Sequence, residues 1–120
     1  MPEIPDSIRQ TQHTDTLELP RYSIVVPCYN EQDSIVPLLE EIVAVIAGDP
    51  AFEIVIVDDC SEDETRARLM QARDNFNPQP KLVSHTVNCG QSAAICTGID
   101  VARGPEDTTV YFTFGNAWGL

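Results

Sequence analysis

The segment FEIVIVDDCS, residues 52–61, decides the fold, because an apolar run at 52–57 leads directly into two adjacent carboxylates. An earlier segment, YSIVVPCYNE at residues 22–31, has the same plan, with an apolar run at 22–26 followed by polar side chains. Runs this rich in Ile and Val are typical of strands that are covered on both faces of a sheet. Shorter runs at 81–85 and 108–114 predict a third and a fourth strand.

The residues between the first two runs have a helical pattern. Apolar side chains recur at spacings of three and four from Ile35 to Ile46, which predicts a helix with one face toward the core. Ser34 would cap this helix and place Pro37 in its first turn, where a missing N–H costs no intrahelical bond.

Two further helices are predicted. Ser61 and Glu64 have the spacing of a capping box that opens a helix from 62 to about 72. The other helix, from 91 to about 102, carries small side chains that would allow close packing on a sheet.

The resulting order, β-α-β-α-β-α-β, predicts an α/β protein with a Rossmann-like parallel sheet and right-handed crossovers. In such sheets the ligand lies outside the carboxyl ends of the strands. We therefore search for function in the residues that follow each apolar run.

Length and charge limit the number of domains and the kinds of partner that this protein can have. The 120 residues suit one domain at 22–120, preceded by a polar stretch at 1–21 that we interpret as a mobile N-terminal arm. Nineteen acidic against seven basic residues give a net charge of -12, which excludes nucleic acid as a favoured partner. A polyanionic ligand would have to be held by backbone donors or by a metal.

The sequence also predicts the compartment. The stretch at 1–21 lacks the layout of a secretory signal, and the longest apolar stretch, at 35–47, is too short to span a bilayer. The cysteines at 28, 60, 89 and 96 form no CxxC pair, so we expect reduced thiols and a cytoplasmic protein.

Pro27, Tyr29 and Glu31 follow the first predicted strand. A base could stack on Tyr29 while Glu31 or Asn30 bonds its edge or its ribose. The alternative is a plain proline turn before a helix, where acidic residues favour the helix dipole.

Asp58 and Asp59 follow the second predicted strand. An acid at this place can accept hydrogen bonds from a base N–H or a ribose hydroxyl. Helix capping is the alternative, but Ser61 is already available for that role.

Asn88 and Gly90 follow the third predicted strand, where a glycine enters the helix that begins at 91. The N–H groups of a helix start can hold a phosphate or sugar oxygen without a basic side chain. A plain turn is the alternative.

The three segments together resemble a known family. VVPCYNE at 25–31, IVDDCS at 56–61 with Asp63 and Thr65, and NCGQSAA at 88–94 with Gly98 resemble the glycosyltransferases of family 2, which have the GT-A fold. Within that family they resemble the polyprenyl-phosphate sugar transferases, such as the dolichol-phosphate mannosyltransferases and the undecaprenyl-phosphate enzymes. The resemblance spans about residues 22–104.

This resemblance implies the nucleotide-binding half of a GT-A fold and a UDP- or GDP-sugar as donor. Pro27, Tyr29, Glu31 and Asp58 or Asp59 would then bind the base and ribose, and Asn88 and Gly90 would lie near the donor. The family passes the sugar to an acceptor, often a lipid phosphate, with Mg²⁺ or Mn²⁺ steadying the diphosphate. A lipid acceptor implies peripheral membrane association as the alternative to a purely cytoplasmic protein.

The sequence departs from the family after Gly104. The family carries an Asp-x-Asp at the end of the fourth strand, whereas residues 113–120 read TFGNAWGL and no carboxylate side chain follows Asp107. The acceptor region of the family would also lie beyond residue 120, so no catalytic residue is named. We expect the chain to be catalytically incomplete, and its unfinished sheet edge to favour self-association.

Two other classes stay open. One is a nucleotide or nucleotide-sugar binding module without chemistry. The other is a metal or redox site formed by Cys28, Cys60 and Cys89, each at the carboxyl end of a different strand, with ordinary free thiols as the commoner alternative.

Overall fold

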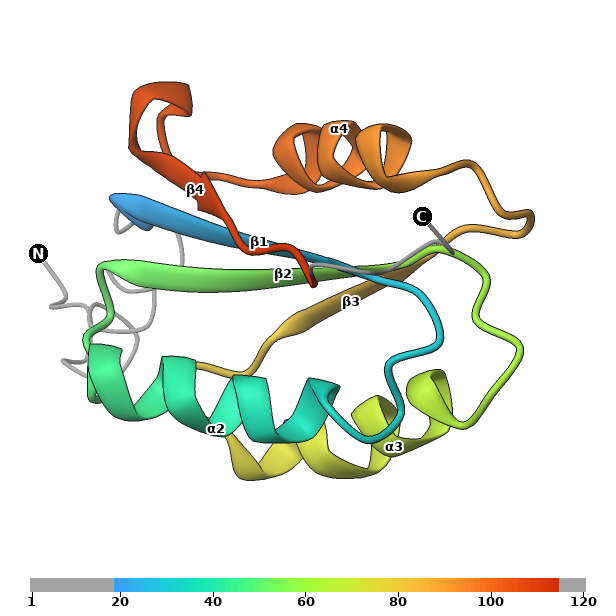
Figure 1. Ribbon diagram of the computed structural model, residues 1–120. Helices are drawn as coiled ribbons and strands as arrows, with labels where there is room; N and C mark the ends of the chain where they lie inside the picture. The colour runs from blue at the N-terminus through green and yellow to red at the C-terminus, as the bar shows by residue number, and fades with distance from the viewer. Residues whose placement is uncertain (1–18, 115–120) are drawn as a thin grey trace, which may run out of the picture.

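The computed structural model describes residues 19–114, and these residues form a three-layer α/β fold (Figure 1). The expected mobile arm lies outside the described residues except for its last three, of which Arg21 donates its N–H to the carbonyl of Ala51 at 2.8 Å. The elements in chain order are β1 (Tyr22–Cys28), α2 (Ile35–Ile46), β2 (Phe52–Asp58), α3 (Thr65–Ala72), β3 (Lys81–Ser84), α4 (Gln91–Val101) and β4 (Thr109–Tyr111).

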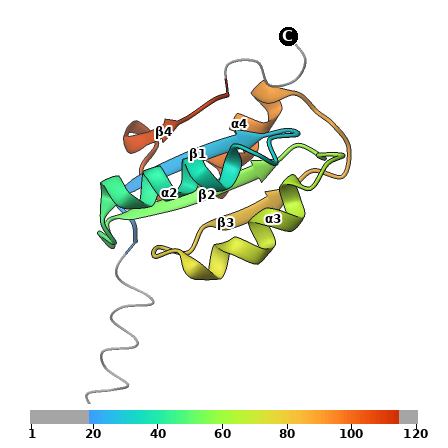
Figure 2. The ribbon, with the colours of Figure 1, turned by 60° about the horizontal axis from the view of Figure 1, so that its bottom comes forward.

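The sheet is parallel throughout and has the strand order β3-β2-β1-β4. The helices α2 and α3 cover one face, and α4 covers the other (Figures 1 and 2). This division follows from the order, because right-handed crossovers that run outward to β3 and then back to β4 must pass on opposite faces. The reversal lies between β1 and β4, where open α/β sheets bind their ligands.

Alternate residues of the central strands pack on different helices. Ile24, Val26 and Cys28 of β1 belong to the core under α2 and α3, whereas Val25 packs on the α4 side. Gly98 lets α4 approach closely, since a Cβ there would lie 2.3 Å from Cγ1 of Val25. Ala94 and Gly98 are buried and so serve the close packing expected of the small residues in this helix, whereas Ser92 is exposed.

The strands end at other residues than the sequence indicated. β1 continues through Pro27 to Cys28, so Pro27 is a buried strand residue and not part of the turn. Pro27 has no N–H to donate to a neighbouring strand. Val25 bonds β4, and Pro27, two residues later, faces the same way, but the register with β4 stops at Val25. The missing N–H of Pro27 therefore costs no bond in the sheet. β4 is shorter than expected and ends at Tyr111.

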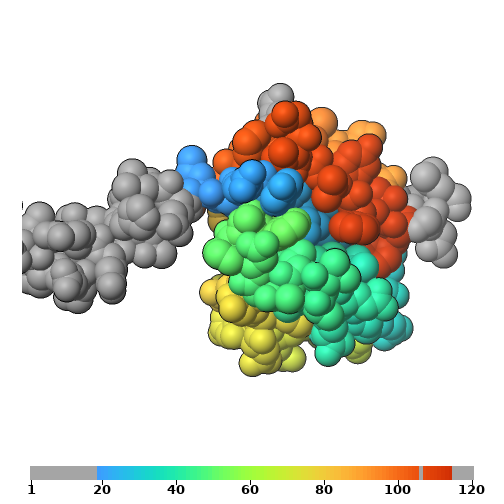
Figure 3. All heavy atoms as spheres, turned by 90° about the vertical axis from the view of Figure 1, so that its left-hand side faces the viewer, coloured from blue at the N-terminus to red at the C-terminus, as the bar shows by residue number. Residues whose placement is uncertain are grey.

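The amino ends of β1 and β2 are held by a buried carboxylate. Glu53 accepts hydrogen bonds from Ser23 Oγ at 2.6 Å, from Lys81 Nζ at 3.2 Å and from the N–H groups of Arg103 and Gly104. Burial alone would raise the pKa of Glu53, but these donors lower it overall. Figure 3 shows this end of the molecule, with the chain after α4 beside the start of β1.

Candidate functional site

The carboxyl ends of three strands lie level with one another. The register pairs Cys28 with Asp58 and Asp58 with Ser84, so the residues that follow β1, β2 and β3 share one edge of the sheet. Tyr29 and Asp58 therefore lie at the same end of the sheet, as expected if the ligand lies outside the carboxyl ends of the strands. Nucleotide binding by these residues stays a prediction.

Asn30 joins the loop after β1 to the loop after β2. Its backbone adopts a left-handed conformation with φ 54°. Its N–H donates to Ser61 Oγ at 2.9 Å, and its side-chain oxygen accepts from the N–H groups of Glu62 at 2.8 Å and Asp63 at 3.3 Å. Asparagine tolerates the left-handed region and supplies both kinds of bond, so its role here is to fix the loops.

A second set of bonds joins the same loops near Glu31. The N–H of Glu31 donates to Thr65 Oγ1 at 2.8 Å, and that hydroxyl donates to Asp63 Oδ1 at 2.5 Å. Burial and the charge of Asp63 raise the pKa of the Glu31 carboxyl. For Asp63, burial alone would raise the pKa, but hydrogen bonds from Thr65 and from the Gln32 N–H lower it.

Asp58 is 1% exposed and bonds within its own turn. It accepts from the hydroxyl and from the N–H of Ser61, and the thiol of Cys28 lies 3.9 Å from its Oδ1. The predicted capping box is therefore wrong, because the Ser61 hydroxyl donates to Asp58 and α3 begins only at Thr65.

One described hollow opens beside Asp58. Its volume is about 470 Å³ and it lies between the ends of β2 and β3. Of the seven predicted site residues, only Asp58 is among its lining residues, which are Asp58, Cys60, Ser61, Arg66, Ser84, His85 and Thr86.

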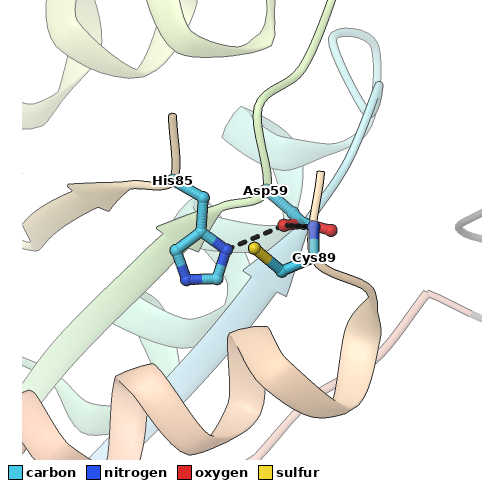
Figure 4. A group of neighbouring side chains, drawn as sticks. All are labelled: Asp59, His85 and Cys89. Carbon is cyan, nitrogen blue, oxygen red and sulfur yellow. Dashed lines mark hydrogen bonds and ion pairs between the residues drawn. The ribbon is translucent and has the colours of Figure 1, made fainter. Parts of the chain in front are cut away.

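Asp59 is fully buried and faces the loop between β3 and α4 (Figure 4). Its carboxylate accepts from the N–H groups of Cys89 and Gly90 and contacts His85 Nδ1, each at 2.8 Å. Its carbonyl accepts from Asn88 Nδ2 at 3.2 Å. The carboxylate thus orders the loop that carries Asn88 and Gly90.

Gly90 enters α4 as expected, with φ 99°, a conformation that side chains disfavour. The N–H groups of Cys89 and Gly90 are already bound to Asp59. An anion at this helix start would therefore have to use the N–H groups that come after Gly90.

His85 is a site residue that the sequence reasoning missed. It follows β3, and its Nε2 lies 2.8 Å from Thr97 Oγ1 on α4, so it bridges Asp59 and the helix. The available signal was its place at a strand end in a chain with only two histidines.

The predicted metal or redox site of Cys28, Cys60 and Cys89 does not form, because these three thiols are not the group of side chains that lies at metal-ligand spacing. Cys28 is buried beside Asp58, and burial together with that charge raises the pKa of its thiol well above the usual range. Cys60 bonds the carbonyl of Thr86 at 3.6 Å. Among the described residues, the group that has this spacing is Asp59, His85 and Cys89. All four cysteines are free thiols, as expected.

The residues after β4 do not fit the metal that the family implies. The described residues there are Phe112, Thr113 and Phe114, which offer no carboxylate, and residues 115–120 lie outside the described part of the chain. We therefore derive no step through Mg²⁺ or Mn²⁺. Among the described helices, none is long and apolar enough to cross a membrane.

Comparison with known proteins shows the family. The model of glycosyl transferase family 2 matches residues 23–117, which extends the likeness beyond Gly104. The curated relatives include polyprenyl-phosphate sugar transferases. One of them, the dodecaprenyl-phosphate galacturonate synthase of Rhizobium johnstonii, is 38% identical over 75% of this chain. The match covers 27% of that relative, so the chain spans about a quarter of its length.

Solved structures show the same fold. S. aureus TarS (residues 1–349) in complex with UDP-GlcNAc has a TM-score of 0.65 and 27% identity over 78% of this chain and 26% of its own. The mannosyltransferase PcManGT of Pyrobaculum calidifontis, in complex with GDP-Man and Mn²⁺, has a TM-score of 0.55 and 30% identity over 72% of this chain and 25% of its own. The parallel α/β sheet and the family match agree, and the chain belongs to glycosyl transferase family 2.

Proposed function

We propose that this chain is the donor-nucleotide half of a sugar transferase that uses a UDP- or GDP-sugar and a polyprenyl-phosphate acceptor. The observation that carries the proposal is the bonded pair of loops after β1 and β2, which holds Tyr29, Glu31 and Asp58 at one edge of the sheet. That edge is also where β1 and β4 mark the reversal of the strand order.

Each residue has a proposed role. Tyr29 stacks on the base, and Glu31 and Asp58 bond the base edge or the ribose, while Pro27 fixes the end of β1 from within the strand. Asp58 is preferred to Asp59 for this contact, since Asp58 lines a hollow whereas the Asp59 carboxylate is bonded to the loop at 85–90. Asn88 and Gly90 lie on that loop and take the donor side of the site.

The relatives support the acceptor, since their names specify polyprenyl phosphates. A lipid acceptor places the protein at the cytoplasmic face of a membrane, where it would bind peripherally. Its charge of -12 disfavours a polyanionic partner such as nucleic acid.

A binding module without chemistry is the second candidate. The observation in its favour is that the described residues after β4 lack the carboxylates that would hold a divalent metal against the diphosphate. On this basis the chain binds the nucleotide weakly, transfers no sugar by itself and gains little from Mg²⁺ or Mn²⁺.

Calorimetric titration with UDP, GDP and their sugar conjugates tests the binding proposal. Tyr29→Ala should lose a stacking contact of about 1–3 kcal/mol, which raises Kd by about 5- to 150-fold. Tyr22→Ala is the matched control, because Tyr22 begins the same strand at its opposite end and stacks on Phe52. Equal losses in the two variants would refute the assignment of the site to the carboxyl edge.

A turnover assay with the same donors separates the two candidates. Strong dependence of binding on Mg²⁺ or Mn²⁺, or transfer of sugar to a polyprenyl phosphate by this chain, would exclude the module without chemistry. Metal-independent binding without turnover would support it.

A further inference from the structure

Three side chains with different donor atoms meet at the loop between β3 and α4 (Figure 4). A carboxylate oxygen of Asp59, Nδ1 or Nε2 of His85 and Sγ of Cys89 all lie within 4.8 Å of one another. They come from the residue after β2, from the residue after β3 and from the residue before Gly90, so the fold brings together segments that are distant in sequence.

The donor set is that of a zinc site. Thiolate, imidazole and carboxylate are the protein ligands of Zn²⁺, at about 2.3 Å for sulfur and about 2.0–2.2 Å for nitrogen and oxygen. Ligand atoms at these lengths around a tetrahedral ion are about 3–4 Å apart. Cys89 is exposed and its thiol donates to the carbonyl of Val87 at 3.3 Å, so its side chain would exchange this bond for the ion as it approaches the other two ligands.

The ligands already have the supporting bonds that metal sites use. A metal-bound histidine donates its other ring N–H to a neighbouring acceptor, and Thr97 Oγ1 lies 2.8 Å from Nε2 of His85. The Asp59 carboxylate is held by the N–H groups of Cys89 and Gly90. The N–H of Cys89 thereby fixes the backbone from which its own thiol projects.

We propose that Asp59, His85 Nδ1 and Cys89 Sγ bind one Zn²⁺ ion, which takes the place of the proton between His85 and Asp59. In the metal-free chain Nδ1 of His85 lies 2.8 Å from the Asp59 carboxylate and Nε2 lies 2.8 Å from Thr97 Oγ1. The tautomer that satisfies both contacts carries its proton on Nδ1 and accepts from the Thr97 hydroxyl at Nε2. On binding, the neutral imidazole changes tautomer: Nδ1 gives its proton to solvent and binds the ion, while Nε2 takes up a proton from solvent and donates to Thr97 Oγ1. The Cys89 thiol also releases its proton, so one proton is released in total. A water molecule fills the fourth position.

Charge and donor type set the selectivity. The dication with one thiolate and one carboxylate is neutral, and it enters a chain whose net charge is -12. Sulfur and nitrogen ligands favour Zn²⁺ or Co²⁺ over Mg²⁺ and Mn²⁺, which prefer oxygen. The site is therefore distinct from a metal held by carboxylates against a diphosphate, and it needs no nucleotide.

Titration of the chelator-treated, tag-free 120-residue chain with Co²⁺ tests the proposal, with Zn²⁺ as the competitor. A thiolate-to-cobalt charge-transfer band should saturate at one ion per chain and disappear on addition of Zn²⁺ but not of Mg²⁺. The band should be lost in Cys89→Ser and retained in Cys96→Ser, a matched control at an exposed cysteine on α4. Both substitutions are at exposed positions, and circular dichroism verifies the fold.

A second variant tests the supporting bond. Thr97→Val should weaken Co²⁺ binding by about 10- to 100-fold, the usual effect of removing a partner of a metal-bound histidine. The proposal is overturned if no charge-transfer band forms, if the band survives in Cys89→Ser, or if it is lost equally in Cys96→Ser. Unchanged affinity in Thr97→Val would overturn the choice of Nδ1 as the ligand atom.

Discussion

The carboxylate of Asp59 should be the most costly side chain to alter at the carboxyl edge of the sheet. It is fully buried, accepts hydrogen bonds from the N–H groups of Cys89 and Gly90, and lies 2.8 Å from His85 Nδ1. Asp59→Asn keeps the shape but replaces one acceptor oxygen with a donor. In the better of the two amide orientations the NH₂ group faces Gly90, so one buried N–H loses its acceptor.

The expected loss follows from these bonds. An unsatisfied buried donor costs about 1–3 kcal/mol, and the two remaining bonds change from charged to neutral, so the free energy of unfolding should fall by about 2–4 kcal/mol. Urea denaturation with chelator present measures this change, and with a slope near 2 kcal/mol per M the midpoint moves by about 1–2 M.

Asp100→Asn is the matched control, because Asp100 is an exposed aspartate on α4, where the change should stay within about 0.5 kcal/mol. A loss at Asp59 no larger than that of the control would refute the view that this carboxylate orders the loop at 85–90.

Three other outcomes follow from the fold. Glu53→Gln should lower stability at neutral pH and flatten its fall in acid. The pKa of Glu53 is lower in the folded chain than its usual value of 4.5, so the unfolded chain binds the proton more tightly. The stability that Glu53 contributes to the wild type is therefore lost as the pH drops below about 4.5. Urea midpoints of both chains at several pH values measure the difference. Gly98→Ala should cost about 1–3 kcal/mol through its clash with Val25, whereas Ser92→Ala, at an exposed site on the same helix, should not; thermal unfolding compares them, and equal Tm values would contradict the close packing. β4 forms an edge whose Tyr111 is 56% exposed, so the chain should self-associate at high concentration and Tyr111→Lys should reduce this; light scattering of a monomeric wild type would refute it.

The sequence predicted the sheet well because its signal is local. The apolar runs and the helical spacing of 35–46 depend on residues that touch within one element or its immediate cover, and β1, α2 and β2 begin at the residues where they were expected. Element ends depend on distant partners instead. The Ser61 hydroxyl could cap a helix, but it donates its hydrogen bond to Asp58, and α3 starts at Thr65.

The directions of the strand-end side chains could not be predicted in the same way. Cys60 adopts a left-handed conformation with φ 62°, and the two carboxylates that precede it have different partners. Asp58 bonds Ser61 within the turn, whereas Asp59 bonds the loop beyond β3. The sequence placed His85 at the end of the third strand, and its N–H does continue the strand ladder by donating to the carbonyl of Asp58. Only the fold shows that its ring lies between Asp59 and Thr97.

The bonds at this edge also decide how a loss of nucleotide affinity must be interpreted. Asp59 and Gly90 hold the loop through their mutual bond, and Asn88 donates to the Asp59 carbonyl, so substitutions at these three positions move the loop before they remove any ligand contact. A direct contact from Tyr29 should instead raise Kd while the free energy of unfolding, extrapolated to zero urea, stays close to wild type. Asp58 also accepts the hydrogen bonds of Ser61, so its substitution should lower both the affinity and the stability. Since a ligand stabilises only the state that it binds, the shift in Tm that saturating nucleotide produces should shrink for a contact residue. For a loop residue the Tm should fall without nucleotide and recover when nucleotide reorders the loop, and this difference separates binding residues from those that position them.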